Sequence, residues 1–441
     1  TNSLQKGYNA NQYNTKGRGR KKKTTTTLPL KATKWVGALN FPQTKNITTP
    51  LNAGPDEVLV WCGHKLTNTY LRTLTPDQRD EIAKDLFNYF TQYNLSNLKP
   101  SDAKIIKDWE NLQKNVVSII NNNGILTVDN RISTGNRIVR RFFNNLWEVS
   151  SAERSSVVDI FNNKEQLWRV IRNRVGNTLI YCDTMTGGSK RAKGKLKCCK
   201  ECPGTGDRHH FPMSMSLKMI VQGIKSSGIA HMASVFKGGV AKAIYERYVK
   251  DGDVILDYSC GFGMRLAGLM ATGKKVKYLG YEPNEKTYVG LHEMARFFKF
   301  DDSIEIKKCG SESVIFEPNI VDFAFSSPPY FTAEIYSSDV KDAQCYNIYT
   351  DYKEWLEKYW RKTVQNIKIM LKDDGVFGAN IGNDSNANML QLKNDMSRII
   401  EEEGFVLVEV IQMLTSRSHL TNKAKTQNSI KLEPCFFYRK K

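Results

Sequence analysis

The spacing of hydrophobic positions divides the chain into two regions with different patterns. Between residues 28 and 180, apolar side chains recur at helical intervals, as at Ile82, Leu86 and Phe90. From residue 211 onward, short apolar runs alternate with amphipathic stretches. The first pattern predicts a mainly helical region, and the second is typical of an α/β protein with a mostly parallel sheet.

The first region is predicted to contain four well-marked helices. Thr75, followed by Pro76, predicts the N-terminus of the first. Ser101 predicts the start of the second, whose apolar stripe runs on to Ile120, and Gly124 predicts its end. The other two pair an apolar face with an arginine face, and their candidate residues are Arg137, Arg140, Arg141 and Arg172. Such a face lies against solvent or against the phosphates of a nucleic acid.

The second region is predicted to form a seven-stranded sheet. The expected strands are Val254–Asp257, Lys277–Glu282, Ile304–Lys307, Val321–Phe325, Val376–Ile381, Phe405–Met413 and Cys435–Arg439. Helices are expected at 284–299, 351–371 and 386–402. No helix separates the last two strands, which predicts an antiparallel pair at the edge of the sheet.

Length and composition set the domain organisation. A chain of 441 residues is too long for one ordinary domain, and its 40% hydrophobic content excludes global disorder. Residues 1–27 have few apolar groups, which predicts a disordered arm. We therefore expect this arm, a mainly helical domain at 28–205 and a sheet-containing domain at 206–441.

The net charge of +20 is concentrated in the first half of the chain. Residues 1–210 contain 34 Lys and Arg against 17 Asp and Glu. A local excess of this size attracts polyanions, so a nucleic-acid partner is expected. Within the arm, Arg18 and Arg20 belong to a basic run at 16–23, which we interpret as an electrostatic tether or a minor-groove contact. No apolar run is long enough to span a membrane and no secretion signal is visible, so we expect an intracellular, cytoplasmic protein without a membrane partner.

A Cys-rich and Lys-rich segment joins the two regions. Its candidate metal ligands are Cys199 and Cys202, together with Cys182 or Cys198 and with His209 or His210. The spacing of Cys199 and Cys202 is that of a zinc knuckle, but a second such pair is missing. The sequence therefore leaves a structural zinc site and a basic loop as alternatives.

A glycine turn follows the first strand of the second region. Asp257 ends that strand, and Cys260, Gly261 and Gly263 form the turn before an apolar helix. Glycines let the backbone approach a ligand closely, and Glu282, at the end of the next strand, can accept the two hydroxyls of a ribose. The turn lacks the residues of a phosphate loop, so an adenosine ligand without phosphates fits it, with S-adenosylmethionine as the candidate.

A double proline follows the fourth strand, in the sequence Ser327-Pro328-Pro329-Tyr330. Two prolines cannot continue a sheet, so they predict a rigid turn at the carboxyl ends of the strands, where open α/β sheets bind ligands. The Ser327 hydroxyl and the carbonyls of the turn can accept hydrogen bonds from an exocyclic amine. Tyr330 offers a ring on which a base can stack.

These motifs, in this order, resemble those of the amino-directed DNA methyltransferases, in particular enzymes of phages and mobile elements. The resemblance covers residues 211–441 and implies a Rossmann-like sheet, S-adenosylmethionine as methyl donor and a flipped DNA base as acceptor. It assigns cofactor contacts to Phe236 and Lys237 before the first strand, and to Ser311 or Glu312 after the third. Serine at the head of the catalytic motif slightly favours cytosine N4 over adenine N6.

Two other functions fit the same residues. Some tRNA methyltransferases that act on guanine N2 also pair an N-terminal RNA-binding domain with a Pro-Pro-Tyr or Pro-Pro-Phe motif. A methyltransferase fold can also persist as a nucleic-acid-binding module without activity. The motifs leave no room for a recognition domain between them, so we expect residues 28–205 to recognise the target. The recognition sequence and the oligomeric state do not follow from the sequence.

Overall fold

The computed structural model describes residues 47–130, 134–151, 153–175, 213–331, 334–336, 344–382, 391–416 and 430–441. Several predicted features lie outside these residues: the arm at 1–27 with Arg18 and Arg20, and the candidate zinc ligands Cys182, Cys199, Cys202 and His209. They remain predictions.

The described part of the first region is mainly helical. Its helices are α2 (Asn68–Thr73), α3 (Pro76–Phe90), η1 (Leu95–Asn97), α4 (Asp102–Lys114), α5 (Asn136–Phe142), η2 (Asn144–Trp147), α6 (Val157–Asn162) and α7 (Lys164–Val175). Helix α8 (Leu217–Ser226) comes later in the chain but packs against α6 and α7. Its strands are β1 (Val60–Trp61), β2 (His64–Lys65), β3 (Ile119–Asn122) and β4 (Ile125–Asp129). The predicted start of α3 is confirmed, because Thr75 caps it by accepting a hydrogen bond from the backbone of Gln78.

The prediction of one long helix from Ser101 to Gly124 is wrong. Helix α4 ends at Lys114, and the strands β3 and β4 form a hairpin around Asn123 and Gly124. Both turn residues have positive φ, 52° and 84°, which is the geometry of an Asn-Gly hairpin turn. The apolar residues that continued the helical spacing are on the surface, since Ile120 is 56% exposed.

The second region contains a large sheet with helices between its strands. The strands are β5 (Val254–Asp257), β6 (Lys277–Tyr281), β7 (Ile304–Lys307), β8 (Val321–Ser326), β9 (Leu371–Asn380), β10 (Phe405–Ser416) and β11 (Ile430–Lys440). The helices are α9 (Gly238–Tyr248), α10 (Met264–Met270), α11 (Glu285–Phe297), η4 (Asp301–Ser303), α12 (Cys345–Ile348), α13 (Tyr352–Glu354), the π-helix η6 (Trp355–Arg361), α14 (Lys362–Met370) and α15 (Leu392–Glu402).

The strand order confirms the predicted α/β fold. Strands of the second region follow the order β7-β6-β5-β8-β9-β11-β10, and β11 alone among them runs antiparallel to its neighbours. This is a Rossmann-like sheet of seven strands, and the predicted antiparallel pair is β10 and β11. The order reverses at β5 and β8, so the loops after these two strands open side by side, where α/β sheets bind ligands.

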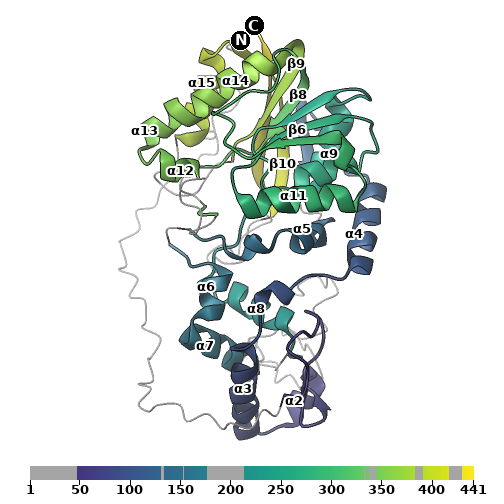
Figure 1. Ribbon diagram of the computed structural model, residues 1–441, viewed down its shortest axis with the longest axis vertical. Helices are drawn as coiled ribbons and strands as arrows, with labels where there is room; N and C mark the ends of the chain where they lie inside the picture. The colour runs from purple at the N-terminus through teal and green to yellow at the C-terminus, as the bar shows by residue number, and fades with distance from the viewer. Residues whose placement is uncertain are drawn as a thin grey trace. The chain divides into compact units, whose positions relative to one another are not determined.

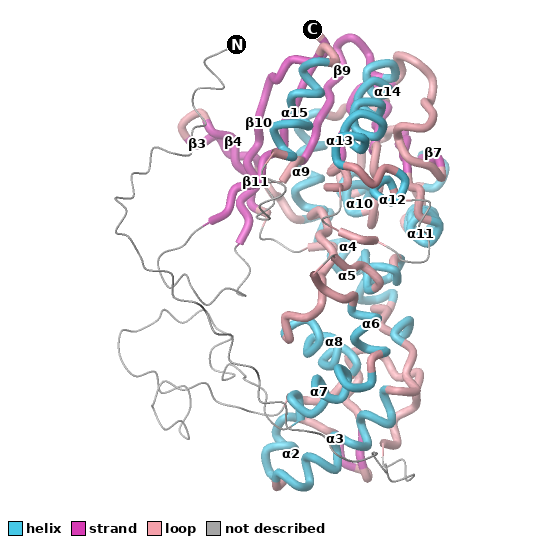
Figure 2. Tube along the Cα trace, turned by 90° about the vertical axis from the view of Figure 1, so that its left-hand side faces the viewer, coloured by secondary structure: helices cyan, strands magenta, loops and turns pink. Residues whose placement is uncertain are grey.

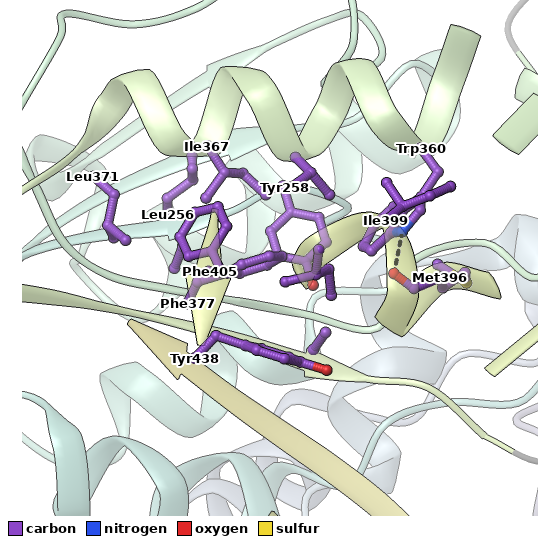
Figure 3. Close-up of a cluster of buried hydrophobic side chains, with 14 of the residues drawn as sticks. Leu256, Tyr258, Trp360, Ile367, Leu371, Phe377, Met396, Ile399, Phe405 and Tyr438 are labelled. Carbon is purple, nitrogen blue, oxygen red and sulfur yellow. Dashed lines mark hydrogen bonds between the residues drawn. The ribbon is translucent and has the colours of Figure 1, made fainter. Parts of the chain in front are cut away.

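Helices cover both faces of this sheet (Figure 1). On one face, α14, α15 and η6 pack on a core that includes Tyr258, Phe377 and Tyr438. Figure 3 shows this core, where the indole nitrogen of Trp360 donates a hydrogen bond of 3.0 Å to the carbonyl of Met396. On the other face lie α9, α10 and α11, and the Tyr245 ring of α9 packs on the aromatic rings of β8.

The β3–β4 hairpin of the first region joins the sheet of the second, beside β10 (Figure 2). Strand β4 pairs in parallel with β10, with Leu126 opposite Ile411 and Asp129 opposite Leu414. The sheet thereby has nine strands in the order β3-β4-β10-β11-β9-β8-β5-β6-β7. The predicted edge position of the β10–β11 pair is wrong, because the hairpin covers β10. The domain boundary at residue 205 remains a prediction, but the described residues on its two sides share this sheet.

Among the residues that the structure describes, no helix combines the length and the apolar character that crossing a lipid bilayer requires.

Candidate functional site

A cavity of about 620 Å³ opens at the carboxyl ends of the parallel strands. Its wall includes the turn after β5, the acid after β6, the loop after β7 and the Ser-Pro-Pro-Tyr turn after β8. The predicted residues that line it are Phe236, Cys260, Gly261, Glu282, Ser311, Ser327, Pro328, Pro329 and Tyr330. The topology therefore brings together motifs that lie up to about 100 residues apart in the sequence.

The glycine turn after β5 has a backbone conformation that residues with a Cβ atom adopt only with strain. Gly261 and Gly263 have φ of 52° and 66°, in the left-handed region. A Cβ on Gly263 would lie only 2.7 Å from the end of Met294 and 2.9 Å from the ring of Phe143. Gly261 lines the cavity, whereas Gly263 is the N-cap of α10 and packs against its surroundings. The two glycines thus have different roles.

Asp257, a predicted cofactor residue, lies behind the cavity wall rather than in it. Its side chain is fully buried and accepts hydrogen bonds from the Arg265 guanidinium at 2.9 and 3.1 Å, from the Ser326 hydroxyl at 2.7 Å and from the Tyr278 hydroxyl at 3.0 Å. Arg265 also donates to the carbonyl of Ser259. Asp257 therefore joins the turns after β5 and β8, and its role is to position them.

Glu282 lies in the cavity wall with its carboxylate close to the glycine turn. One oxygen accepts from the backbone N–H of Gly261 and the other from that of Asn284, both at 2.9 Å. Burial raises the pKa of this carboxyl to about 7, although the two backbone hydrogen bonds favour its ionised form. A carboxylate in this position retains lone pairs for the two hydroxyls of a ribose.

The loop after β7 brings Ser311 and Glu312 to the cavity. The Ser311 hydroxyl lies 2.9 Å from that of Thr363, and its carbonyl accepts from Asn366 at 2.8 Å, so its polar groups have partners. Glu312 is 8% exposed, and its Oε2 atom has no hydrogen-bond partner. A buried acceptor of this kind requires a donor, and an adenine amine is such a donor. The cavity therefore has acceptors that fit both ends of an adenosine.

The Ser327–Tyr330 turn holds its tyrosine rigidly. The Tyr330 hydroxyl donates to the carbonyl of Asn380 at 2.9 Å, accepts from the N–H of Gly382 at 2.9 Å and lies 3.3 Å from the Ser327 hydroxyl. Burial raises the pKa of this hydroxyl, so it stays protonated near neutral pH. With its hydroxyl fully engaged, Tyr330 presents its ring, rather than an acid or a base, to the cavity.

Three further predicted residues have clear positions. Phe236 lines the cavity, and its ring centre lies 5.8 Å from the guanidinium carbon of Arg265. Lys237 is the N-cap of α9 and lies outside the cavity wall. Cys260 is buried in the wall, and burial raises its thiol pKa well above the usual range, so it is not a nucleophile.

The sequence reasoning missed several residues that line the cavity after β4 and on β10 and β11. Asn130 follows β4 and lines the cavity, with its Oδ1 atom buried and without a hydrogen-bond partner. Met413 and Glu433 face each other on β10 and β11 and line the same wall. The Asn123-Gly124 pair, which the sequence analysis took for a helix end, is the hairpin signal that could have located β4 and with it Asn130.

The predicted nucleic-acid arginines do not form one group. Arg137 lies 3.6 Å from Asp108, Arg141 3.0 Å from Asp102 and Arg172 3.4 Å from Asp80. These ion pairs fit solvated helix faces. Arg140 has no ion pair with a described residue, and its guanidinium lies over the ring of Trp147.

The part of the chain that the structure describes contains no group of three or more side chains able to hold a metal ion. The predicted zinc ligands lie outside that part, so the zinc site stays a prediction.

No family model matches the chain, and no curated protein matches it. Solved structures that resemble part of the chain are mostly methyltransferases, and a [4+2]-cyclase is among them. A geranyl diphosphate C-methyltransferase from Streptomyces coelicolor A3(2) is 12% identical over 46% of this chain and 76% of that one, with a TM-score of 0.33. TrmN from Thermus thermophilus is 14% identical over 47% and 50%, with a TM-score of 0.32. An O-methyltransferase from Thermotoga maritima is 18% identical over 52% and 73%, with a TM-score of 0.31. These values are too low to indicate a substrate, which must be inferred from the site.

Proposed function

We propose that the protein transfers a methyl group from S-adenosylmethionine to an exocyclic amino group of a base in DNA. The observation that carries this proposal is the shared cavity: the acceptors for an adenosine and the Ser-Pro-Pro-Tyr turn lie in one wall, after adjacent strands of the sheet. S-adenosylmethionine supplies a methyl group on a sulfonium, which needs no metal and no protein nucleophile.

The residues present fit this methyl donor. Glu282 would bind the ribose hydroxyls, because its carboxylate is fixed by Gly261 and Asn284. Glu312 would accept from the adenine amine, which gives its unpartnered oxygen a donor. The glycine turn next to Glu282 lets the backbone lie close to the ligand.

The Ser327–Tyr330 turn would hold the acceptor base. The Ser327 hydroxyl and the turn carbonyls accept hydrogen bonds from the amino group, which raises the electron density on its nitrogen. The nitrogen forms a bond to the methyl carbon, the carbon–sulfur bond breaks with its electrons staying on sulfur, and one amine proton leaves to solvent. Tyr330 positions the base by stacking, since its hydroxyl stays protonated near neutral pH and cannot act as a base.

Target recognition would come from the first region. Its basic excess favours a polyanionic substrate, and β4 brings Asn130 into the cavity. A base must leave its stack to reach the turn, as in other enzymes that modify bases. Cytosine N4 is slightly favoured over adenine N6 by the serine at position 327.

Transfer of tritiated methyl groups to duplex DNA, followed by nucleoside mass spectrometry, tests the proposal. Tyr330→Ala should lower turnover by about a hundredfold through lost positioning, and Tyr330→Phe should lose less because it keeps the ring. Tyr288→Ala is the matched control, because this tyrosine packs on His292 of α11 outside the cavity.

The outcomes separate the candidate functions. Label in N4-methylcytosine or N6-methyladenine, lost in Tyr330→Ala but not in Tyr288→Ala, supports the proposal. Label in RNA alone would establish an RNA base methyltransferase instead. DNA binding without any transfer would leave a binding module, and a Tyr330→Ala enzyme of normal rate would exclude the assigned role of the turn.

A further inference from the structure

Two cationic side chains from separate segments lie over Trp147, and a third lies near one of them. The Nζ atom of Lys225, on α8, lies 4.5 Å from the centre of a Trp147 ring, and the guanidinium carbon of Arg140, on α5, lies 5.9 Å from it. Lys237, at the start of α9, is close enough to Arg140 for their charges to repel. We name Arg140, Lys225 and Lys237 the cation cluster.

None of the three has an ion pair or a hydrogen bond with a described residue. Neighbouring arginines on α5 differ in this respect, because Arg137 pairs with Asp108 and Arg141 pairs with Asp102. Asp108 and Asp56 attract Arg140, but both form their ion pairs with other cations, so the described chain neutralises the cation cluster only in part.

All three side chains are also partly withdrawn from water. Burial, and then repulsion by a neighbouring arginine, lowers the pKa of each group, and that of Lys225 falls to about 8. Like charges in a half-buried place oppose folding of the protein by itself. An anion held between them removes that repulsion and supplies acceptors for their N–H groups.

The cation cluster borders the wall of the cavity. Lys237 directly follows Phe236, and the same segment contributes His231 and Ser234 to the cavity. The backbone N–H of His231 donates to the carbonyl of Ser155 at 2.8 Å, which ties this segment to the first region. An anion at the cluster would therefore lie next to the segment that forms this part of the cavity wall.

We propose that the cation cluster binds a backbone phosphate of the DNA strand whose base enters the cavity. The proposal rests on the proposed function and names a contact that holds its substrate. A phosphodiester offers oxygens for the planar fork of an arginine and for two ammonium groups. Such a contact fixes the register of the strand without reading its sequence.

The test compares two variants that each remove two positive charges. Arg140→Gln/Lys225→Met removes charge from the cluster, and the methionine keeps an aliphatic stem on Trp147. Lys250→Met/Arg439→Gln is the control, because both of its residues are exposed and lie at the other end of the strands, near the start of β5 and the end of β11. Binding of a fluorescein-labelled mixed-sequence duplex is measured by anisotropy over a range of salt concentrations.

The cluster variant should bind the duplex roughly ten- to a hundredfold more weakly than the parent protein. The slope of log affinity against log salt should also decrease by about 0.9 for each phosphate that the variant no longer neutralises. The control should change much less in both respects. Calorimetry with S-adenosylmethionine and a melting temperature near that of the parent show that the variants are folded, and Lys225→Met alone is a second, milder variant.

Equal affinities and salt slopes in the cluster and control variants, with the parent binding DNA normally, would overturn the phosphate site and leave the proposed function standing. A parent protein that binds S-adenosylmethionine but no DNA at low salt would overturn the proposed function and the phosphate site together.

Discussion

Replacing each of the two acids near the glycine turn by its amide should affect different properties, ligand affinity in one case and stability in the other. Glu282→Gln should weaken S-adenosylmethionine binding with little loss of stability. Asp257→Asn should destabilise the fold with little loss of affinity in the protein that remains folded. The basis is their position: Glu282 lines the cavity, whereas Asp257 is fully buried behind it.

The magnitudes follow from the partners of each group. Glu282→Gln replaces charge-assisted hydrogen bonds to two ribose hydroxyls with neutral or mismatched ones, which is worth about 2–4 kcal/mol, or roughly 30- to 1000-fold in affinity. Its effect on stability is limited to one mismatched backbone N–H, at Gly261 or Asn284, or about 1–2 kcal/mol. Asp257→Asn leaves the Arg265 charge buried without a counter-ion, which costs about 3–5 kcal/mol of unfolding free energy.

Isothermal titration calorimetry gives the affinities, and urea unfolding gives the stabilities. Two results would refute the reasoning. One is a Glu282→Gln protein that binds within about threefold of the parent. The other is an Asp257→Asn protein of unchanged stability that loses more affinity than Glu282→Gln, because Asp257 would then contact the ligand directly.

Three further predictions follow from neighbouring features. Arg265→Met should lower the unfolding free energy, measured by urea unfolding, by about 3–5 kcal/mol, and adding Asp257→Asn should restore part of the lost stability. Equal stability of the parent and Arg265→Met would contradict the buried ion pair. Methylthioadenosine, which does not titrate near neutrality, should bind roughly tenfold better at about pH 8 than at about pH 6, because Glu282, whose raised pKa is about 7, must be ionised to bind it. In the ligand-free protein, the same raised pKa makes the unfolding free energy fall as the pH rises from about 4.5 to about 7. Asn130→Ala should lower kcat/KM for DNA by roughly tenfold while the affinity for S-adenosylmethionine stays the same. Loss of that affinity instead would show that Asn130 contacts the methyl donor rather than the base.

Much of the sheet could be predicted because a buried parallel strand leaves a strong pattern. Val321–Phe325 and Val254–Asp257 are short apolar runs bounded by turn residues, and both lie in the centre of the sheet. Chemistry-bearing residues follow such strands directly, so the glycine turn and the Ser327–Tyr330 turn could be located from the sequence alone.

The β3–β4 hairpin and the different roles of Asp257 and Glu282 could not be predicted in the same way. Val116 and Ile120 continued the spacing of α4 by coincidence, since both are exposed in the structure. Asp257 and Glu282 both end strands, and only the tertiary positions of Arg265 and Gly261 distinguish a buried partner from a cavity acid. The cation cluster joins residues about 100 positions apart, with no local sequence signal.

The β3–β4 hairpin limits how the protein can be divided. A fragment that begins near residue 206 would contain all the methyltransferase motifs, but β10 would lose its pairing with β4 along Ile411–Leu414. An unpaired strand edge of this kind is a template for intermolecular pairing, so such a fragment is expected to aggregate. It would also lack Asn130 in the cavity. Biochemical work on the catalytic half is therefore better done with a fragment that starts before β3, or with the two halves expressed together.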